Sequence, residues 1–157
     1  MKKTKNNYPV TESYLSGGGR MSTPERLFQN EGFLLLTELL PDGVFIEAMV
    51  YEWLTFNLPG GKYTPDFGLI CTDNSWIFVE VKQETVSKRS GRVFRGQSYR
   101  DSRSKLRAAA SLNPWCKFYM AAYSRGGWRL EYIEPTEFIY PSSMKVEEEN
   151  APPIDQS

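Results

Sequence analysis

Three charged side chains interrupt two apolar segments in the middle of the chain. The stretch YTPDFGLICTDNSWIFVEVKQ, residues 63–83, carries Asp66 just before FGLI, and Glu80 and Lys82 inside WIFVEVKQ. A charged group in the interior of a sheet is costly unless it is paired with an opposite charge or bound to a metal ion. The two carboxylates and the lysine therefore need compensation, which makes them candidates for a chemical site.

The spacing of these residues predicts that they meet at one end of a hairpin. Alternate residues of a strand share a face, so Glu80 and Lys82 point the same way. Asp66 joins them only if it lies opposite residue 80 or 82, and a two-residue turn gives the wrong parity. We therefore predict a three-residue loop over 72–74, ending in an asparagine that suits a left-handed backbone. The same register sets Gly68 beside an aromatic ring of the second strand.

Two carboxylates and a lysine in this arrangement are suited to phosphodiester hydrolysis. Carboxylate oxygens are hard ligands for Mg²⁺ or Mn²⁺, so we expect Asp66 and Glu80 to bind such an ion with the backbone carbonyl of Val81. A bound ion activates water and stabilises charge on a phosphate, and Lys82 would add a fixed positive charge. Without a metal ion the carboxylates would repel, and one would be driven towards protonation.

The chain contains no histidine and two cysteines, which excludes several classes of site. Nucleophilic systems that need a histidine base are excluded, as are zinc sites that need histidine. Cys71 and Cys116 lie inside apolar segments, so we expect two buried free thiols in a reducing compartment. Acid–base chemistry is left to carboxylates, lysine, tyrosine or metal-bound water.

Helix, strand and turn signals predict one α/β domain over residues 23–140, with a mixed four- to five-stranded sheet flanked by helices in the order α-β-β-β-α-β-β. Ser22 or Thr23 caps the first helix, and Gly32 weakens the case for one unbroken helix there. The elements expected in chain order are a helix over 23–40, a strand or bent pair of strands over 44–58, the hairpin over 63–83, a loop over 83–97, a helix over 98–113, and strands over 115–123 and 128–134.

The ends of the chain differ in composition from the middle. Residues 1–22 are polar and end in SGGGR, which predicts a flexible tail, and residues 141–157 are acidic and proline-rich, which predicts disorder. The basic N-terminus has no apolar segment behind it, and no apolar run reaches membrane-spanning length. We therefore expect a soluble, cytoplasmic protein with no membrane partner.

Positive charge is concentrated between residues 82 and 107, although the whole chain is neutral. This segment holds nine Lys or Arg against two acids, Glu84 and Asp101. Such a patch beside a carboxylate site suits a phosphate backbone, and a solvated basic loop and helix is the alternative interpretation. The expected nucleic-acid-binding residues are Lys88, Arg89, Arg92, Arg95, Arg100, Arg103, Lys105 and Arg107.

Pro65-Asp66 followed by Glu80-Val81-Lys82 resembles the signature of the PD-(D/E)xK nuclease superfamily, which includes restriction endonucleases and Holliday-junction resolvases. The resemblance runs from about residue 23 to residue 134, and the chain is also similar to a family of small phage and prophage endonucleases. It implies a restriction-endonuclease-like core with Asp66, Glu80 and Lys82 as catalytic residues. It also implies that Glu25, in STPERLF, is a catalytic residue and metal ligand on the first helix. The segment QETVSKRSGRVFRG, after Lys82, is longer than in those relatives, so the resemblance says nothing about its contacts.

Each candidate also has a purely structural interpretation. Asp66 follows a proline and could serve a turn, and Glu80 and Lys82 could form a pair on a solvated strand face. Glu25 could interact only with the helix dipole, and Glu31 competes with it as the ligand from the first helix.

Residues and resemblance together predict a Mg²⁺-dependent endonuclease that hydrolyses DNA, with Mn²⁺ able to substitute. Structured or branched DNA is the expected substrate, by analogy with small phage enzymes that act in recombination. If the chain is encoded by a phage, we expect it to act in the cytoplasm of the bacterial host. A non-catalytic DNA-binding or host-interaction protein on the same fold is one alternative, and an RNA-acting nuclease is another. A homodimer would suit the cutting of two strands.

Overall fold

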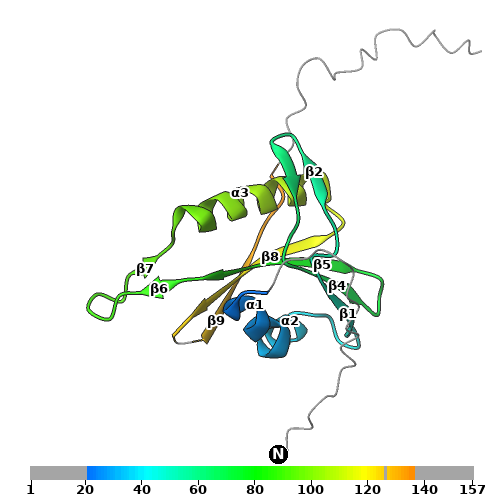
Figure 1. Cartoon of the computed structure of the whole chain (residues 1–157). Helices are drawn as coiled ribbons and strands as arrows, with labels where there is room; N and C mark the ends of the chain where they lie inside the picture. The colour runs from blue at the N-terminus through cyan, green and yellow to red at the C-terminus, as the bar shows by residue number, and fades with distance from the viewer. Residues whose placement is uncertain (1–20, 126, 137–157) are drawn as a thin grey trace, which may run out of the picture.

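A mixed five-stranded sheet forms the centre of the molecule (Figure 1). The computed structural model describes residues 21–125 and 127–136, so most of the predicted tails lies outside the described residues. Strands β5 and β8 are parallel, and the other neighbouring pairs are antiparallel. The predicted α/β class and mixed sheet are confirmed. The strands, in spatial order, are β1 (Ile46–Tyr51), β4 (Phe67–Cys71), β5 (Trp76–Gln83), β8 (Lys117–Ser124) and β9 (Gly127–Tyr132).

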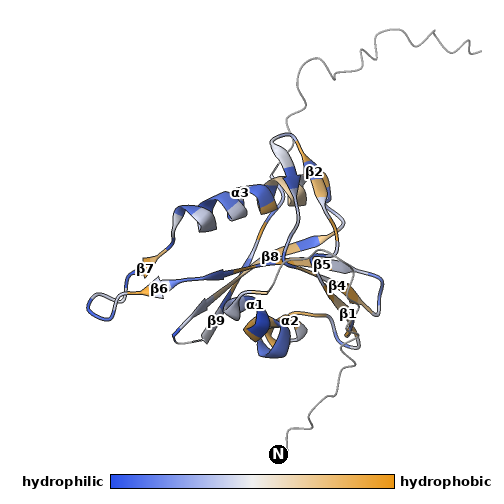
Figure 2. Ribbon diagram, in the orientation of Figure 1, coloured by the Kyte–Doolittle hydropathy of each residue, from blue (hydrophilic) through white to orange (hydrophobic). Residues whose placement is uncertain are grey.

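Helix α3 (Gln97–Leu112) makes the crossover that the parallel pair requires. It ends at Leu112, and Asn113 is its C-cap before a proline, where the sequence predicts the helix to stop. Together with the hairpin of β2 (Phe56–Leu58) and β3 (Gly61–Tyr63), it covers one face of the sheet (Figure 1). Hydrophilic residues colour most of α3 in Figure 2, because only its sheet-facing stripe is buried.

The opposite face is covered by the N-terminal segment, whose parts are α1 (Thr23–Leu27), η1 (Phe28–Gly32) and α2 (Leu34–Thr37). Ser22 is the N-cap of α1, as predicted, and it forms a capping box with Glu25. The first helix therefore begins at Thr23, directly after its predicted cap.

The predicted single helix is wrong, because the π-helical turn η1 interrupts it. A π turn takes in an extra residue and so rotates the residues that follow about the axis. After this turn, Leu34 and Leu39 are 46% and 54% exposed, whereas Leu36 is buried. Gly32 lies inside η1, where a Cβ would be only 2.7 Å from the ring of Phe28.

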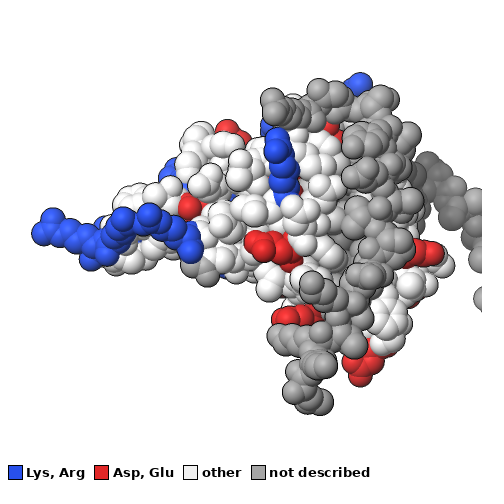
Figure 3. All heavy atoms as spheres, turned by 60° about the horizontal axis from the view of Figure 1, so that its bottom comes forward, with Lys and Arg blue, Asp and Glu red and all other residues white. Residues whose placement is uncertain are grey.

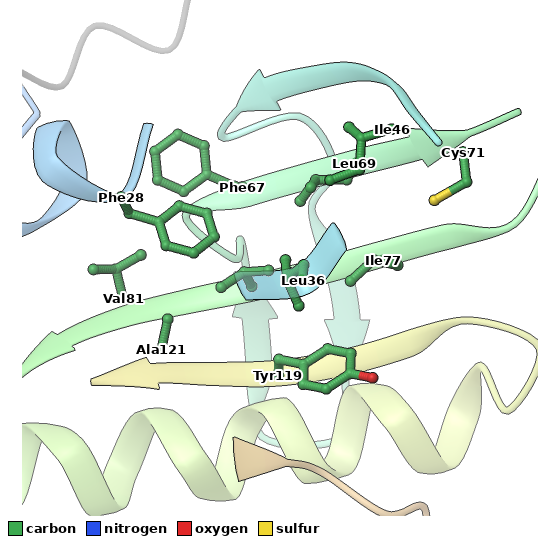
Figure 4. Close-up of a cluster of buried hydrophobic side chains, with 11 residues drawn as sticks. Phe28, Leu36, Ile46, Phe67, Leu69, Cys71, Ile77, Val81, Tyr119 and Ala121 are labelled. Atoms are coloured by element: carbon green, nitrogen blue, oxygen red, sulfur yellow. The ribbon is translucent and has the colours of Figure 1, made fainter. Parts of the chain in front are cut away.

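Two hydrophobic clusters fill the space on either side of the sheet. Figure 4 shows the one under the N-terminal segment, where Phe28 meets Phe67 with ring centroids 5.1 Å apart. The other lies under α3 and includes Phe78, Leu106, Phe118 and Met120. Each cluster holds one buried free cysteine: Cys71 in the first and Cys116 in the second, as predicted.

The segment 83–97, predicted as a loop, instead forms a hairpin of β6 (Thr85–Val86) and β7 (Val93–Phe94) that projects from the body (Figure 1). The sequence prediction is wrong here because each strand is only two residues long, too short to show a period. Gly91 takes the left-handed conformation (φ +66°) in the turn between them. We call residues 84–95 the arm.

Among the described residues, no helix is long and apolar enough to cross a membrane.

Candidate active site

The hairpin of β4 and β5 has the register that the candidate site requires. Phe67 pairs with Val79 and Gly68 with Phe78, so Asp66 lies across from residue 80. The connection is the predicted three-residue loop over 72–74, in which Asn74 has φ +64°. Asp66 and Glu80 are therefore brought to the same end and the same face of the hairpin.

Glu80 is a buried carboxylate with two compensating partners. Its side chain accepts a 2.7 Å hydrogen bond from the hydroxyl of Tyr63, and the ammonium of Lys82 lies 3.0 Å from its other oxygen. Only 4% of the residue is exposed, which contradicts the alternative of a solvated strand face. A buried carboxylate that is both paired and hydrogen-bonded is held in one orientation.

Asp66 is held beside this carboxylate by the backbone of the neighbouring strand. Its Oδ2 accepts a 2.7 Å hydrogen bond from the N–H of Val81. Burial and then the negative charge of Glu80 raise the pKa of Asp66 to about 8, although the Val81 N–H acts in the opposite direction. Burial and a neighbouring carboxylate both disfavour the ionised form of Asp66.

Glu25 lies near this pair without joining it. Its carboxylate accepts hydrogen bonds from the N–H of Ser22 (2.7 Å) and from the hydroxyl of Tyr51 (3.0 Å). Its charge contributes to the raised pKa of Asp66. In the part of the chain that is described, however, no three His, Cys, Asp or Glu side chains lie close enough together to hold a metal ion. Glu31, the competing candidate, is exposed in η1.

The donor chemistry of the Asp66–Glu80 pair fits a divalent ion such as Mg²⁺. Both are hard oxygen donors, and Mg²⁺ commonly uses one or two protein carboxylates while water and phosphate complete its shell. The raised pKa of Asp66 comes first from burial and then from the charge of Glu80, and the charge of Lys82 offsets it only in part. The contact that the structure gives between Val81 and Asp66 uses the N–H of Val81, so the role of its carbonyl stays a prediction.

Sequence reasoning missed three residues around the site. Tyr63 is buried, and its hydroxyl orients Glu80. Tyr51 contacts Glu25 across elements that only packing brings together. Glu52 has a left-handed backbone (φ +47°), rare outside glycine, and its N–H donates to the carbonyl of Asp66 at 2.8 Å. None of these contacts has a local sequence signal.

The predicted nucleic-acid-binding residues divide into three groups. Arg95 is paired with Glu84 (3.0 Å), and Arg103 is paired with Glu131 (2.7 Å), so each guanidinium already has a carboxylate partner within the protein. Arg107 is half-buried, with its Nε lacking a hydrogen-bond partner. The remaining five are exposed and form no ion pair with any described residue: Lys88, Arg89, Arg92, Arg100 and Lys105.

Figure 3 shows basic side chains gathered over the arm, which stands out from a mostly uncharged body. The basic group predicted from composition is therefore a projecting tip and part of one helix face. The nine Lys and Arg of residues 82–107 therefore do not form one continuous basic surface.

No family model and no curated protein matches this sequence. Among solved structures, one titled "Crystal structure of SSO0001" is similar, with 16% identity and a TM-score of 0.31. The match covers 73% of this chain and 55% of that one, so this chain spans about half the length of that structure. A likeness at this TM-score supports no argument about fold family or function.

Proposed function

We propose that the protein is a metal-dependent nuclease that hydrolyses phosphodiester bonds in DNA, on a restriction-endonuclease-like core. The observation that carries this proposal is the pair of the half-buried Asp66 and the buried Glu80, held on one face of a hairpin end with Lys82 beside it. Ionising Asp66 beside the buried carboxylate of Glu80 is costly, which raises the pKa of Asp66, and such perturbed groups concentrate at functional sites.

The proposed assignment gives each residue a separate task. Asp66 and Glu80 would hold Mg²⁺, or Mn²⁺ in its place, and the bound ion would stabilise phosphate charge and make water a better nucleophile. The N–H of Val81 keeps Asp66 in position, and the hydroxyl of Tyr63 does the same for Glu80. The ammonium of Lys82, now 3.0 Å from Glu80, would face the phosphate or the attacking water.

Glu25 is retained in the proposal as a third ligand from α1. To reach an ion shared by Asp66 and Glu80, its carboxylate would have to leave the N–H of Ser22 and the hydroxyl of Tyr51. Both partners are themselves polar groups that water can satisfy, so this exchange is chemically feasible.

The architecture is compatible with the superfamily that the sequence resembles. Its members share a helix, a group of strands that includes the motif strands, a crossover helix and a further strand, and the order here is α1, β1, β4, β5, α3, β8, β9. The element order supports the proposal but does not by itself specify an activity.

The partner in this proposal is DNA, contacted through the exposed cations of the arm and of α3. Branched or otherwise structured DNA is the proposed substrate, in keeping with a role in recombination of phage DNA. A homodimer would place two sites on two strands, and light scattering of the full chain would test it.

The first experiment is cleavage of labelled substrates by wild type, Asp66→Asn and the matched control Asp42→Asn, whose carboxylate lies in an exposed turn. The substrates are duplex, single-stranded, flap and four-way-junction DNA, with RNA in parallel, each in Mg²⁺, Mn²⁺ or EDTA. We expect metal-dependent cutting that Asp66→Asn lowers at least about 100-fold and that Asp42→Asn leaves unchanged.

Three outcomes would redirect the proposal. Binding of DNA without any cutting would favour the non-catalytic DNA-binding alternative. Preferential cutting of RNA would replace DNA as the substrate. Cutting that persists in EDTA, or in Asp66→Asn, would remove this carboxylate pair as the active site.

A further inference from the structure

The arm exposes three large apolar side chains although it projects from the body of the protein. Val86, Val93 and Phe94 are 40%, 46% and 58% exposed. Val86 pairs with Val93, and Thr85 with Phe94, so the two faces of this ribbon each present apolar surface. Apolar residues on a ribbon that does not pack against the body are available to a partner.

The tip of the arm adds positive charge to this apolar ribbon. Lys88 and Arg89 lie in the turn and Arg92 follows it, all exposed and without an ion-pair partner among the described residues. In Figure 3 basic side chains extend beyond the rest of the surface at the end of the molecule where the arm lies. Unbalanced cations at the end of a projecting element indicate a polyanionic partner.

The base of the arm is anchored to the body. Glu84 is 6% exposed and accepts hydrogen bonds from Arg95, across the arm, and from Arg129 of β9. Arg129 also donates to the hydroxyl of Tyr99 on α3 at 3.1 Å, and Arg95 lies 5.2 Å from the centre of that ring. The charges at the base are therefore used for anchoring, and those at the tip are left for binding.

The arm is also continuous with the candidate active site. Strand β5 carries Glu80 and Lys82 and ends at Gln83, and β6 begins at Thr85. A phosphate backbone held by the arm would thus lie at the same end of β5 as the carboxylate pair.

We propose that the arm is a groove-binding β-ribbon for double-stranded DNA, so that duplex is the part of the substrate that the nuclease engages. This inference rests on the proposed function and names its substrate class. The major groove of B-form DNA, about 12 Å wide, admits a two-stranded ribbon, in which tip cations reach phosphates and apolar side chains reach base edges such as the thymine methyl group.

The same features disfavour other nucleic acids. The deep, narrow major groove of double-stranded RNA excludes such a ribbon. Single strands bind to platforms of several aromatic residues, and the arm has one aromatic side chain, Phe94. A B-form duplex is therefore the partner that the shape, charge and apolar surface of the arm fit together.

The test is fluorescence anisotropy of labelled duplex DNA, single-stranded DNA and double-stranded RNA, all in EDTA. Binding is measured from about 50 to about 200 mM salt, because affinity that depends on phosphate contacts falls steeply over this range. It compares wild type with Arg89→Ala/Arg92→Ala and with the charge-matched control Lys62→Ala/Lys117→Ala, whose positions are also exposed. Because every changed side chain is exposed, all three proteins should fold alike, which circular dichroism checks.

We expect wild type to prefer the duplex over both other nucleic acids. The arm variant should lower the slope of log K against log salt by about 2, since each lost phosphate contact removes about 0.9. The control should keep the wild-type slope. Phe94→Ala should weaken duplex binding without changing the slope, because it removes an uncharged contact.

The inference is overturned if arm variant and control bind the duplex equally, or if single strands or double-stranded RNA bind as tightly as the duplex. Its failure is separable from that of the proposed function, because binding is measured without metal. Loss of duplex binding in the arm variant together with an absence of Asp66-dependent cutting supports the arm and rejects the nuclease. Asp66-dependent cutting together with unchanged duplex binding by the arm variant supports the nuclease and rejects the arm as its DNA-binding element.

Discussion

Asp66 connects the chemistry of the site to the stability of the fold. Its pKa is raised from the ordinary 3.8 to about 8 by burial and by the charge of Glu80. The folded protein therefore holds this proton more tightly than the unfolded chain does. The contribution of Asp66 to the free energy of unfolding is greatest below its ordinary pKa and is lost as the pH rises towards 8.

A divalent ion should reverse this loss. At pH 8, Mg²⁺ should raise the melting temperature of wild type, because the ion stabilises the ionised carboxylates of the folded state alone. Asp66→Asn should show little increase, and Asp42→Asn should match wild type. Thermal melts followed by circular dichroism, with and without Mg²⁺, measure this. An equal increase in all three proteins would place the bound ion elsewhere.

Tyr63 should stabilise the fold through one hydrogen bond. Tyr63→Phe removes the hydroxyl that donates to Glu80 and leaves a buried carboxylate oxygen without that donor. We expect the free energy of unfolding to fall by about 1–2 kcal/mol in urea titrations. Tyr132→Phe is the control, since that side chain is 46% exposed. Equal stability of the two variants would show that water replaces the lost donor.

At the scale of elements, the hairpin of β4 and β5 depends on a close approach at Gly68. A Cβ there would lie 2.6 Å from the ring of Trp53 and 3.2 Å from that of Phe78. Gly68→Ala should cost about 1–3 kcal/mol of stability, because two packed rings would have to move. Gly60→Ala, where nothing lies within 4 Å, should be nearly neutral. Chemical denaturation of both variants compares them, and equal midpoints would contradict the packing argument.

The anchor of the arm predicts a pH-dependent effect. Burial would raise the pKa of Glu84, but hydrogen bonds from Arg129 and then Arg95 outweigh it, so the pKa is lowered. The stability that this carboxylate adds is present above its ordinary pKa and is lost as the pH falls through the lowered value. Glu84→Gln should therefore destabilise the protein at pH 7, by about 1–2 kcal/mol.

Urea titrations of wild type and Glu84→Gln at several pH values measure this difference. It should shrink towards zero in acid, below the lowered pKa of Glu84. Glu47→Gln is the control, because Glu47 is exposed on β1. A difference between wild type and Glu84→Gln that does not change with pH would show that the carboxylate charge is not what anchors the arm.

At the scale of the whole molecule, one sheet separates two hydrophobic clusters, and each cluster holds a thiol. Burial raises the pKa of both Cys71 and Cys116, which makes their thiolates scarce. The native protein should react slowly with a thiol reagent such as dithionitrobenzoate, and two thiols should react at once in urea. Fast reaction of one thiol in the native state would show that its cluster opens locally.

The sequence by itself determined the features that depend on neighbouring residues. The cap at Ser22, the end of α3 before Pro114, and the loop over 72–74 all follow from local backbone preferences. A loop of three residues then places Asp66 opposite residue 80, because the number of loop residues sets which residues of the two strands pair. Turn chemistry and strand parity are therefore sufficient to bring the motif residues together.

Only the tertiary structure decided which charges are free and which are already paired. Glu131 balances Arg103 from 28 residues away, and Arg129 reaches Glu84 across 45. Such pairs form because helix and strands pack on one sheet, and no local pattern encodes that packing. The same packing places Tyr63 on Glu80 and leaves the arm standing clear of the body, so long-range contacts choose the partners of side chains that local rules had already positioned.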